Sequence, residues 1–533
     1  MTAVIADAKV ATTAAVPTQF TPIITEGGTL CLENSLRVGE PEHAHVRWHY
    51  PLYHCLHSQP RPVFSRSGEK TTAAEIWVGA RLCVSAFREM ALTRGDRLIL
   101  ALPPSGSFIQ VLIAALWEGL TIIPMPPPSS LNALEDAIIE TDARCVITDS
   151  SLTKEIERTS VPLPFNGANP GSVACATRPR KARLARTPDT RFLLRTSGTS
   201  SPGGGRLIAL SDRNLLSVLE SHLPRLGLNE DKTHVLSVLP WHHSFGLVLD
   251  LLPALLSGAQ ISRVDSDSKG GDFINVIQNV GEATFATHMN TVPVIARNLS
   301  VTERGRCFLR SLKGGVVGGA PVDADLAAFL STTRLRAGYG QTEAGPGIAL
   351  GEPGHWPGPG YLGKPLGCQT VCDKDDVLHF SGENACIGVW KPGFGLENLS
   401  PTRRVRTGDI VRMVDDDAGE PDLYFVARDD DDFKLSNGRR VEAGLWEARL
   451  IERFPFITDA MLHSPDGERL QIVFTSASGD ALLPSLTEIA AALGSLGSKL
   501  SGMRSVPPAF WVRTPKGTRI RRACVEKLVS QAI

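Results

Sequence analysis

The chain has 533 residues, of which 42% are hydrophobic and 21% charged, and its formal net charge is -1. This length exceeds what one hydrophobic core supports, so we expect two or more domains. A charge near zero gives no general attraction to polyanions, so we expect neither nucleic acid nor an anionic membrane as a partner.

The first 25 residues are rich in Ala, Thr and Val but lack a basic start followed by an unbroken apolar core. They predict a flexible tail and no signal peptide. Ten cysteines are scattered without a Cys-x-x-Cys spacing, which predicts reduced thiols and a cytoplasmic location. The most apolar stretch, 98–126, is interrupted by prolines and polar residues, so we expect no membrane span.

From residue 70 onward, strands alternate with helices. The pattern predicts a helix at 73–90, a strand at 97–102, a helix at 108–118 and a strand at 121–125. A second unit of this kind begins with a strand at 145–148 and a polar linker at 162–186. It continues through strands at 235–239, 260–264 and 313–317, with a helix-like run at 273–280. Such alternation predicts parallel sheets covered by helices on both faces.

After residue 365 the sequence pattern changes to short strands separated by turns, at 377–380, 410–414 and 423–426. This pattern predicts a small β-rich subdomain. The last hundred or so residues mix helical and strand signals. The predicted fold class is therefore α/β. Two parallel-sheet α/β subdomains and a small β-rich subdomain form a large N-terminal domain, 26–427, and a small α+β C-terminal domain occupies 428–533.

Residues 192–206 read Phe-Leu-Leu-Arg-Thr-Ser-Gly-Thr-Ser-Ser-Pro-Gly-Gly-Gly-Arg, a strand that opens into a loop of glycines and hydroxyl residues. Glycines let backbone N–H groups approach an anion, and the hydroxyls add donors, so the loop is suited to phosphate. Its spacing is neither that of a P-loop NTPase nor a dinucleotide fingerprint. The alternative is a flexible Ser/Gly linker.

Six segments, in order, resemble motifs of the adenylate-forming superfamily, which includes acyl-CoA synthetases, adenylation domains of nonribosomal peptide synthetases and firefly luciferase. They are Thr196-Ser-Gly-Thr-Ser200, Pro240-Trp-His-His-Ser-Phe-Gly246, Gly318-Gly-Ala-Pro321, Gly338-Tyr-Gly-Gln-Thr-Glu343, Arg406-Thr-Gly-Asp409 and Arg428-Asp-Asp-Asp-Asp-Phe-Lys434. The segment Phe433-Lys-Leu-Ser-Asn-Gly438 looks most like long-chain acyl-CoA synthetases and carboxylic acid reductases. The resemblance implies that the C-terminal domain is a mobile lid.

The resemblance also implies ATP and Mg²⁺ as cofactors. The residues it assigns to ATP are Thr196, Ser197, Gly198, Thr199, Ser200, Arg206, Gly318, Ala320, Pro321, Gly338, Tyr339, Gly340, Gln341, Thr342, Asp409, Arg428 and Lys434. The usual lysine of the phosphate loop is missing, and Arg206 is the candidate replacement.

Within this set, Tyr339 is expected to stack on adenine and Thr342 to hydrogen-bond the α-phosphate. Glu343 is expected to ligate Mg²⁺, because a hard cation takes carboxylate and phosphate oxygens. Asp409 is expected to accept hydrogen bonds from the ribose hydroxyls.

His242 and His243 invite a metal interpretation, but successive residues of an extended segment point to opposite sides and no carboxylate or cysteine completes a site. The resemblance places His243 beside the acid pocket; a structural histidine is the alternative. The other expected pocket residues, each of which could equally be ordinary core, are Phe245, Met289, Val317 and Gly318.

Two C-terminal features complete the comparison with the family. Asp430 is expected to be the hinge of the lid, where a residue must tolerate two backbone conformations. The tail Thr514-Pro-Lys-Gly-Thr-Arg-Ile-Arg-Arg522 should carry the lysine that bridges carboxylate and phosphate, but the family's motif is not intact. Lys516 and Arg519 are the catalytic candidates, Thr518 also aligns there, and Arg519 could instead anchor the tail to the lid. The alternative for the whole tail segment is that its basic residues only begin a C-terminal helix and have no catalytic role.

The predicted function is that of an ATP-dependent acid ligase, which forms an acyl-adenylate from a small-molecule acid and releases pyrophosphate. The acyl group would then pass to a thiol of CoA or of an acyl carrier protein's phosphopantetheine. One alternative is a ligase with a non-thiol acceptor or a small or inorganic acid. Another is a nucleotide-binding relative that has lost catalysis.

Overall fold

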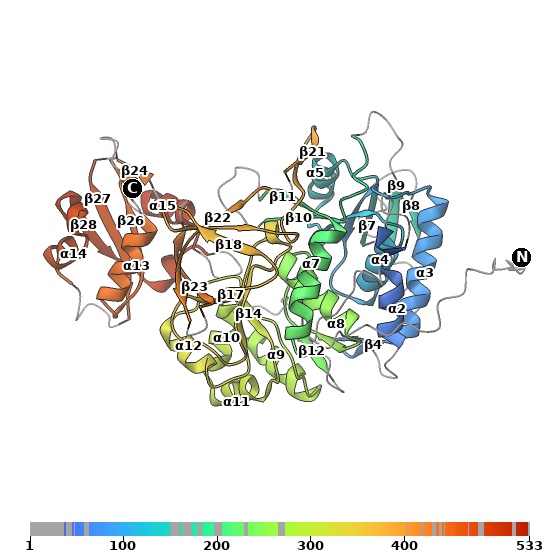
Figure 1. Cartoon of the computed structure of the whole chain (residues 1–533), viewed down its shortest axis with the longest axis horizontal. Helices are drawn as coiled ribbons and strands as arrows, with labels where there is room; N and C mark the ends of the chain where they lie inside the picture. The colour runs from blue at the N-terminus through green and yellow to red at the C-terminus, as the bar shows by residue number, and fades with distance from the viewer. Residues whose placement is uncertain are drawn as a thin grey trace, which may run out of the picture.

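The structure, a computed structural model, describes residues 37–38, 45–46, 48–57, 63–149, 160–162, 173–177, 184–196, 205–228, 233–264, 272–400, 402–416, 419–428, 433–435, 440–441, 443–466, 468–477, 484–513 and 519–530. The molecule is elongated, with the C-terminal unit at one end (Figure 1). The predicted tail, residues 1–25, lies outside the described residues.

The largest sheet has nine strands in the order β21-β20-β11-β10-β6-β5-β7-β9-β8. They are β5 (Arg97–Ala101), β6 (Thr121–Pro124), β7 (Cys145–Asp149), β8 (Ser160–Pro162), β9 (Val173–Thr177), β10 (Phe192–Arg195), β11 (Leu207–Leu210), β20 (Gly388–Lys391) and β21 (Gly395–Asn398). Its centre, β10-β6-β5-β7, is parallel, as the alternating pattern predicted. The edges are antiparallel.

Two details of the sequence prediction are wrong here. The sequence pattern places the strand at 145–148 in a second unit, yet β7 pairs with β5 in the same sheet. The polar linker at 162–186 contains strand β9, which pairs with β7. Short strands of small residues such as β9, Val-Ala-Cys-Ala-Thr, carry little hydrophobic pattern and are hard to recognise from sequence.

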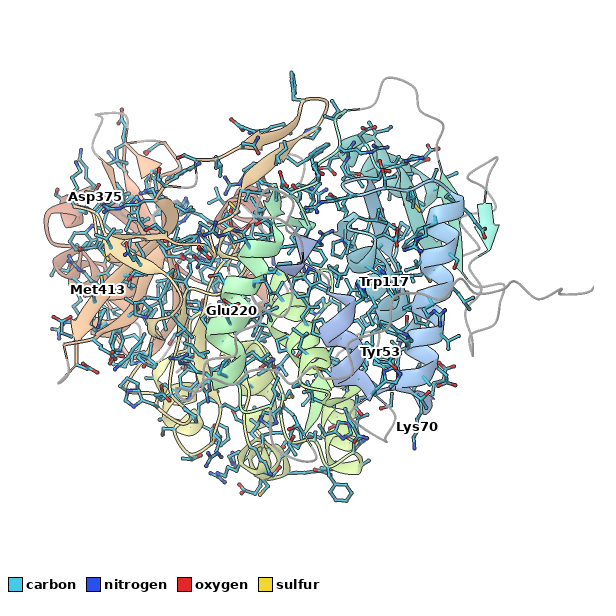
Figure 2. All side chains as sticks on the ribbon, turned by 45° about the vertical axis from the view of Figure 1, so that its right-hand side comes forward. Tyr53, Lys70, Trp117, Glu220, Asp375 and Met413 are labelled. Atoms are coloured by element: carbon cyan, nitrogen blue, oxygen red, sulfur yellow. The ribbon has the colours of Figure 1, made fainter. Side chains whose placement is uncertain are left out.

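Helices α2 (His49–His57), α3 (Ala73–Glu89), α4 (Gly106–Trp117) and α5 (Leu131–Thr141) accompany this sheet. Helix α4 begins where the Ser105 side chain accepts from the Phe108 N–H, and its residues 108–116 are all buried. Helix α2 docks through aromatic rings: Tyr53 and Trp117, both labelled in Figure 2, each pack against Trp77 at centroid distances of 4.7 and 5.2 Å.

The second sheet has the order β12-β13-β3-β4, and its first three strands are parallel. They are β3 (Phe64–Arg66), β4 (Glu69–Thr71), β12 (His234–Ser237) and β13 (Gln260–Arg263). Between β11 and β15 (Arg336–Tyr339) the chain forms eight helices that the structure describes. They are α7 (Asp212–His222), η1 (Leu223–Arg225), the π-helix η2 (Phe245–Leu251), α8 (Leu252–Leu256), α9 (Asp272–Ala283), α10 (Pro293–Ser300), α11 (Glu303–Ser311) and α12 (Ala324–Leu330).

The third sheet has the order β14-β15-β16-β17-β23-β22-β19-β18 and is antiparallel beyond β15. Its strands are β14 (Val316–Gly318), β15 (Arg336–Tyr339), β16 (Ala349–Leu350), β17 (Tyr361–Pro365), β18 (Gln369–Cys372), β19 (Val377–Ser381), β22 (Val405–Asp415) and β23 (Pro421–Arg428). The strand expected at 313–317 is β14, which opens this sheet. It is also linked to β12, because His288 forms parallel bridges both to Val235 of β12 and to Gly314. A further two-stranded sheet pairs β1 (Arg37–Val38) with β2 (His45–Val46).

The C-terminal unit has its own apolar clusters, drawn from residues between 433 and 528. Its elements are β24 (Phe433–Lys434), β25 (Arg440–Val441), α13 (Ala443–Arg453), β26 (Ile457–His463), β27 (Leu470–Ser476), α14 (Leu486–Ala492), η6 (Gly494–Lys499), β28 (Leu500–Ser505), η7 (Pro508–Phe510) and α15 (Arg521–Ser530). A Cβ on Gly444 would lie 2.9 Å from the Ala427 side chain, so the start of α13 presses against β23.

Within the described part of the chain, no helix combines the length and the apolar character that crossing a membrane requires. Seven described cysteines are free thiols. Cys145 is disulfide-bonded, so the prediction of reduced thiols throughout is wrong at this position.

Candidate active site

The phosphate-loop segment joins two antiparallel strands, β10 and β11, whose ends clamp it. Thr196 and Arg206 exchange two hydrogen bonds: the Thr196 N–H donates to the Arg206 carbonyl at 2.8 Å, and the Arg206 N–H donates to the Thr196 hydroxyl at 2.9 Å. A Cβ on Gly205 would lie 1.7 Å from the Thr196 carbonyl, so only glycine fits there. Four further predicted loop residues lie outside the described residues: Ser197, Gly198, Thr199 and Ser200.

Arg206 and Glu343 are in direct contact. An Arg206 guanidinium N–H donates to Glu343 Oε1 at 2.7 Å across 137 residues of sequence. The Glu343 side chain is 12% exposed and the Arg206 side chain 60% exposed. The candidate loop cation and the candidate metal ligand therefore meet at one point. Because the arginine is the exposed and flexible partner, it can move toward a phosphate without unpacking the glutamate.

The donor chemistry at Glu343 fits Mg²⁺. This ion is usually bound by one or two carboxylates together with substrate phosphates. Among the residues described here, no cluster of three or more His, Cys, Asp or Glu could hold a metal without such phosphates.

The segment from Gly338 to Ile348 comprises the end of β15 and the loop that connects it to β16. Its tight course explains two of its glycines. A Cβ on Gly340 would lie 1.5 Å from the Pro346 carbonyl, and one on Gly338 would lie 2.3 Å from Val316. Thr342 and Glu343 sit in the short helix η3 (Thr342–Ala344). In the described structure the buried Gln341 Nε2 has no hydrogen-bond partner, so this loop retains an unsatisfied donor.

Asp409 on β22 is held from two sides. The Tyr339 hydroxyl donates to Asp409 Oδ2 at 2.6 Å, and the Arg428 guanidinium donates to Oδ1 at 2.8 Å. Burial, followed by the negative charge of Asp409, raises the pKa of Tyr339 well above its usual range, so the phenol keeps its proton and remains a donor. A carboxylate accepts hydrogen bonds at both of its oxygens, which is the kind of acceptor that ribose hydroxyls require.

Tyr339→Phe is expected to raise the KM for ATP by about 3- to 30-fold with little change in kcat, because one charged hydrogen bond that orients Asp409 is lost. The matched control is Tyr361→Phe, which removes a similar Tyr–Asp contact, 3.2 Å to Asp422, on β17. Pyrophosphate release against ATP concentration measures both. Equal KM values for Tyr339→Phe and the wild type would show that Asp409 is oriented without this hydroxyl.

The histidine motif leads into the π-helix η2. His243 is half-buried, its N–H donates to the Pro240 carbonyl at 3.2 Å, and its ring lies 4.4 Å from that of His242. Burial, and then the charge of Arg263, lower the pKa of His242 to about 4, so it is neutral at neutral pH. π-Helices frequently occur at functional sites.

The other expected acid-pocket residues surround β14. Phe245 lies 3.7 Å from where a Cβ on Gly318 would be, so a side chain there would meet this ring. Met289 and Val317 are fully buried. Ala320 is half-buried and Pro321 exposed, at the end of β14. Trp241 is fully buried against Phe64 and Phe108, so it is core.

A buried polar network, which sequence reasoning missed, fixes this motif from behind. The Ser237 hydroxyl donates to Asp250 Oδ2 at 2.6 Å, and Asn290 Nδ2 donates to Oδ1 at 3.1 Å. Asn290 Oδ1 accepts from the Val316 N–H at 2.9 Å, which ties η2 to β14. The sequence signal for it was present, since Asp250 interrupts an apolar run from Leu247 to Leu256.

The C-terminal tail is anchored by arginines. Arg519 and Arg521 both form ion pairs with Glu447 of α13, and Glu447 is only 3% exposed. Each also donates to a β26 carbonyl, Arg519 to Ala460 and Arg521 to Leu462. This placement favours the anchoring role for Arg519. Lys516, Thr518 and Asp430 lie outside the described residues, as does the Lys434 side chain.

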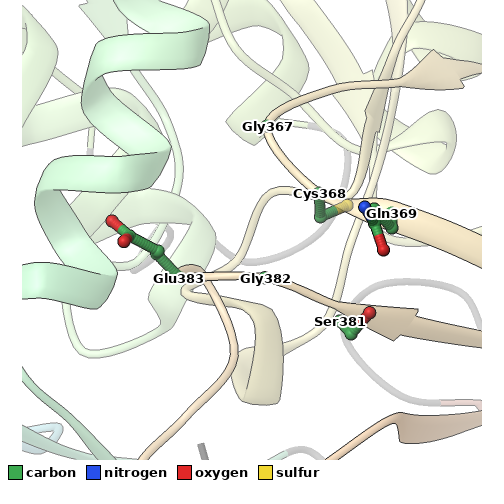
Figure 3. A pocket seen from close by; sticks show the side chains of 6 residues that line it. All are labelled: Gly367, Cys368, Gln369, Ser381, Gly382 and Glu383. Carbon is green, nitrogen blue, oxygen red and sulfur yellow. The ribbon is translucent and has the colours of Figure 1, made fainter. Parts of the chain in front are cut away.

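A separate hollow of about 480 Å³ lies beside the β18–β19 hairpin, and its lining is Gly367, Cys368, Gln369, Ser381, Gly382 and Glu383 (Figure 3). Of the expected site residues that the structure describes, none lines it. Glu383 at its rim pairs with Arg213 of α7.

Comparison with known proteins adds family information to this geometry. The family model described as "AMP-binding enzyme" matches residues 53–380. The chain is 23% identical over 301 residues to "Probable CoA ligase CCL5" of Humulus lupulus, covering 52% of this chain and 53% of that protein. It is 27% identical over 267 residues to "Acyl-CoA ligase AFT1-1" of Alternaria alternata, covering 46% and 45%. The chain thus spans about half the length of these two relatives.

The fold is also shared with solved structures. ATP-bound MatB from Rhodopseudomonas palustris superimposes with a TM-score of 0.66 at 17% identity, covering 91% of this chain and 99% of that one. At this identity the likeness concerns the fold.

Proposed function

The chain belongs to the AMP-binding enzyme family, and we propose that it is an ATP-dependent ligase that joins an acid to AMP. The meeting of Arg206 with Glu343 carries this proposal. This contact brings together a cation at the end of the phosphate loop and a carboxylate of the kind that binds Mg²⁺. Thr342, the residue before Glu343, offers a hydroxyl suited to the α-phosphate. Asp409, bound to Tyr339 of the same segment, offers a carboxylate suited to ribose.

In the proposed reaction an oxygen of the substrate carboxylate attacks the α-phosphorus of ATP. The bond from that phosphorus to the bridging oxygen breaks, and pyrophosphate leaves. Two anions must approach each other, so the chain's task is positioning and charge neutralisation. Arg206 stabilises the departing phosphates, Thr342 donates to the α-phosphate, and Asp409 holds the ribose. Glu343 would hold Mg²⁺, and the ion would neutralise charge on the phosphates when it is bound.

We propose a thiol as acceptor in the second step, either CoA or the phosphopantetheine of a carrier protein. The thiolate attacks the acyl carbonyl, and AMP leaves with its phosphate oxygen. The names of the two relatives support CoA. The lid, hinged at Asp430, would exchange the groups facing the adenylate between the two steps.

We also propose a cytoplasmic location. Seven free thiols among the described cysteines agree with a reducing compartment, although the disulfide at Cys145 does not. Fractionation of expressing cells tests the location directly.

A pyrophosphate-release screen over fatty, aromatic and small acids, with and without CoA, tests the function. We expect at least one acid to release pyrophosphate in an ATP-dependent way and to give a thioester by mass spectrometry when CoA is present. Acyl-AMP with a product other than a thioester would indicate a non-thiol acceptor. Tight ATP binding without pyrophosphate release for any acid would contradict a ligase and indicate a relative that has lost catalysis.

A further inference from the structure

Ser244 stands between the acid-side motif and the nucleotide-side motif. It follows His243 and precedes Phe245, the first residue of η2. Its hydroxyl lies 3.3 Å from the Thr342 hydroxyl, across 98 residues of sequence. Both residues are buried, at 4% and 9% exposure. This contact joins the segment expected to line the acid pocket to the residue expected to hold the α-phosphate.

The Ser244 hydroxyl does not cap the helix that follows it. Serines that start helices usually accept a backbone N–H with their side chain, but Ser244 makes no such capping bond. In the described part of the chain, Thr342 is the side-chain partner that its hydroxyl contacts. A buried hydroxyl directed at one other hydroxyl therefore needs an explanation other than helix capping.

The backbone that carries Ser244 is held in place on both sides. A Cβ on Gly246 would lie 2.2 Å from the Pro240 carbonyl, so the backbone of the turn packs closely against the start of η2. Downstream, Asp250 is held by the Ser237 hydroxyl and the Asn290 amide. Asn290 also donates to the Leu249 carbonyl at 2.9 Å. The position of the Ser244 hydroxyl is therefore set by the fold.

We propose that Ser244 is a positioning residue for adenylation, which orients the Thr342 hydroxyl toward the α-phosphate. This role rests on the proposed function. A hydroxyl donates one hydrogen bond and accepts others, so Thr342 can accept from Ser244 while donating to a phosphate oxygen. Accepting the first bond polarises the second and strengthens it. The 3.3 Å distance is long for two hydroxyls, and such contacts often tighten only when substrate is bound.

Ser244→Ala is expected to lower kcat for pyrophosphate release by about 3- to 10-fold, the size of one neutral hydrogen bond, with the KM values for ATP and acid changed less than about twofold. Ser244→Thr keeps the hydroxyl and should restore most of the rate. Ser65→Ala is the matched control, since it removes a hydroxyl that faces Ser262 at 2.8 Å in the second sheet, and it should leave kcat unchanged.

A double-mutant cycle with Thr342→Val separates this role from general packing. If Ser244 acts through Thr342, Ser244→Ala should cost nothing further once Thr342 has lost its hydroxyl. An equal loss in both backgrounds, or a kcat for Ser244→Ala equal to the wild-type value, would overturn the role while leaving the ligase function intact. A wild-type enzyme that releases no pyrophosphate with any acid would overturn the proposed function, and this role with it.

Discussion

Glu343→Gln is expected to reduce pyrophosphate release to near background while the fold stays intact. The amide is a poor Mg²⁺ ligand, so charge on the β- and γ-phosphates returns to oppose the attacking carboxylate. Loss of the Arg206 contact should cost little stability, because the arginine is 60% exposed and water screens the pair. Pyrophosphate release against Mg²⁺ concentration, together with a thermal melt, measures both effects.

Two controls separate metal binding from loss of the ion pair. Glu383→Gln removes the carboxylate of another Arg–Glu pair, with Arg213, and should leave adenylation unchanged. Arg206→Gln breaks the same pair as Glu343→Gln but keeps the carboxylate. We expect it to slow adenylation by about 30- to 1,000-fold without changing the Mg²⁺ dependence. Ordinary turnover of Glu343→Gln at limiting Mg²⁺ would show that this glutamate is not the ligand.

The sequence predicted the parallel sheets because buried strands and helices leave strong periodic signals, as at β5 and α4. Motif order assigns Tyr339, Asp409 and Arg428 to the nucleotide, and the structure places these three side chains in contact with one another. Motif order does not reveal which side chains the site residues contact. The pairing of Arg206 with Glu343 depends on how β11 and the loop after β15 are placed in space, and no local pattern encodes that.

Pairs of buried polar groups were the least predictable part. Ser244 with Thr342 and Asp250 with Asn290 each join segments far apart in the chain. A serine or an aspartate in an apolar run signals that a partner exists, because a buried polar group without one is costly. Its identity follows only from the tertiary fold. Strand β9 was missed for a different reason, since its five small residues carry almost no periodic signal.

Lys516→Ala is expected to lower adenylation by about 30- to 1,000-fold while transfer from preformed acyl-AMP stays nearly normal. Its ammonium is a compact charge on a flexible stem, suited to bridging the carboxylate and the α-phosphate. Only the first half-reaction brings those two anions together. The two half-reactions, assayed separately by pyrophosphate release and by thioester formation, measure the difference.

Arg519→Ala should behave differently, because Arg519 is 16% exposed and bound to the buried Glu447. Removing it leaves that carboxylate with Arg521 alone, so the lid should lose stability and both half-reactions should fall together. Arg521→Ala removes the other partner of the same carboxylate and should reproduce the effect. A selective loss of adenylation in Arg519→Ala but not in Arg521→Ala would make Arg519 the bridging cation. If Lys516→Ala and Arg519→Ala both adenylate normally, neither tail candidate supplies the bridging charge, and the cations still assigned to ATP are Arg206, Arg428 and Lys434.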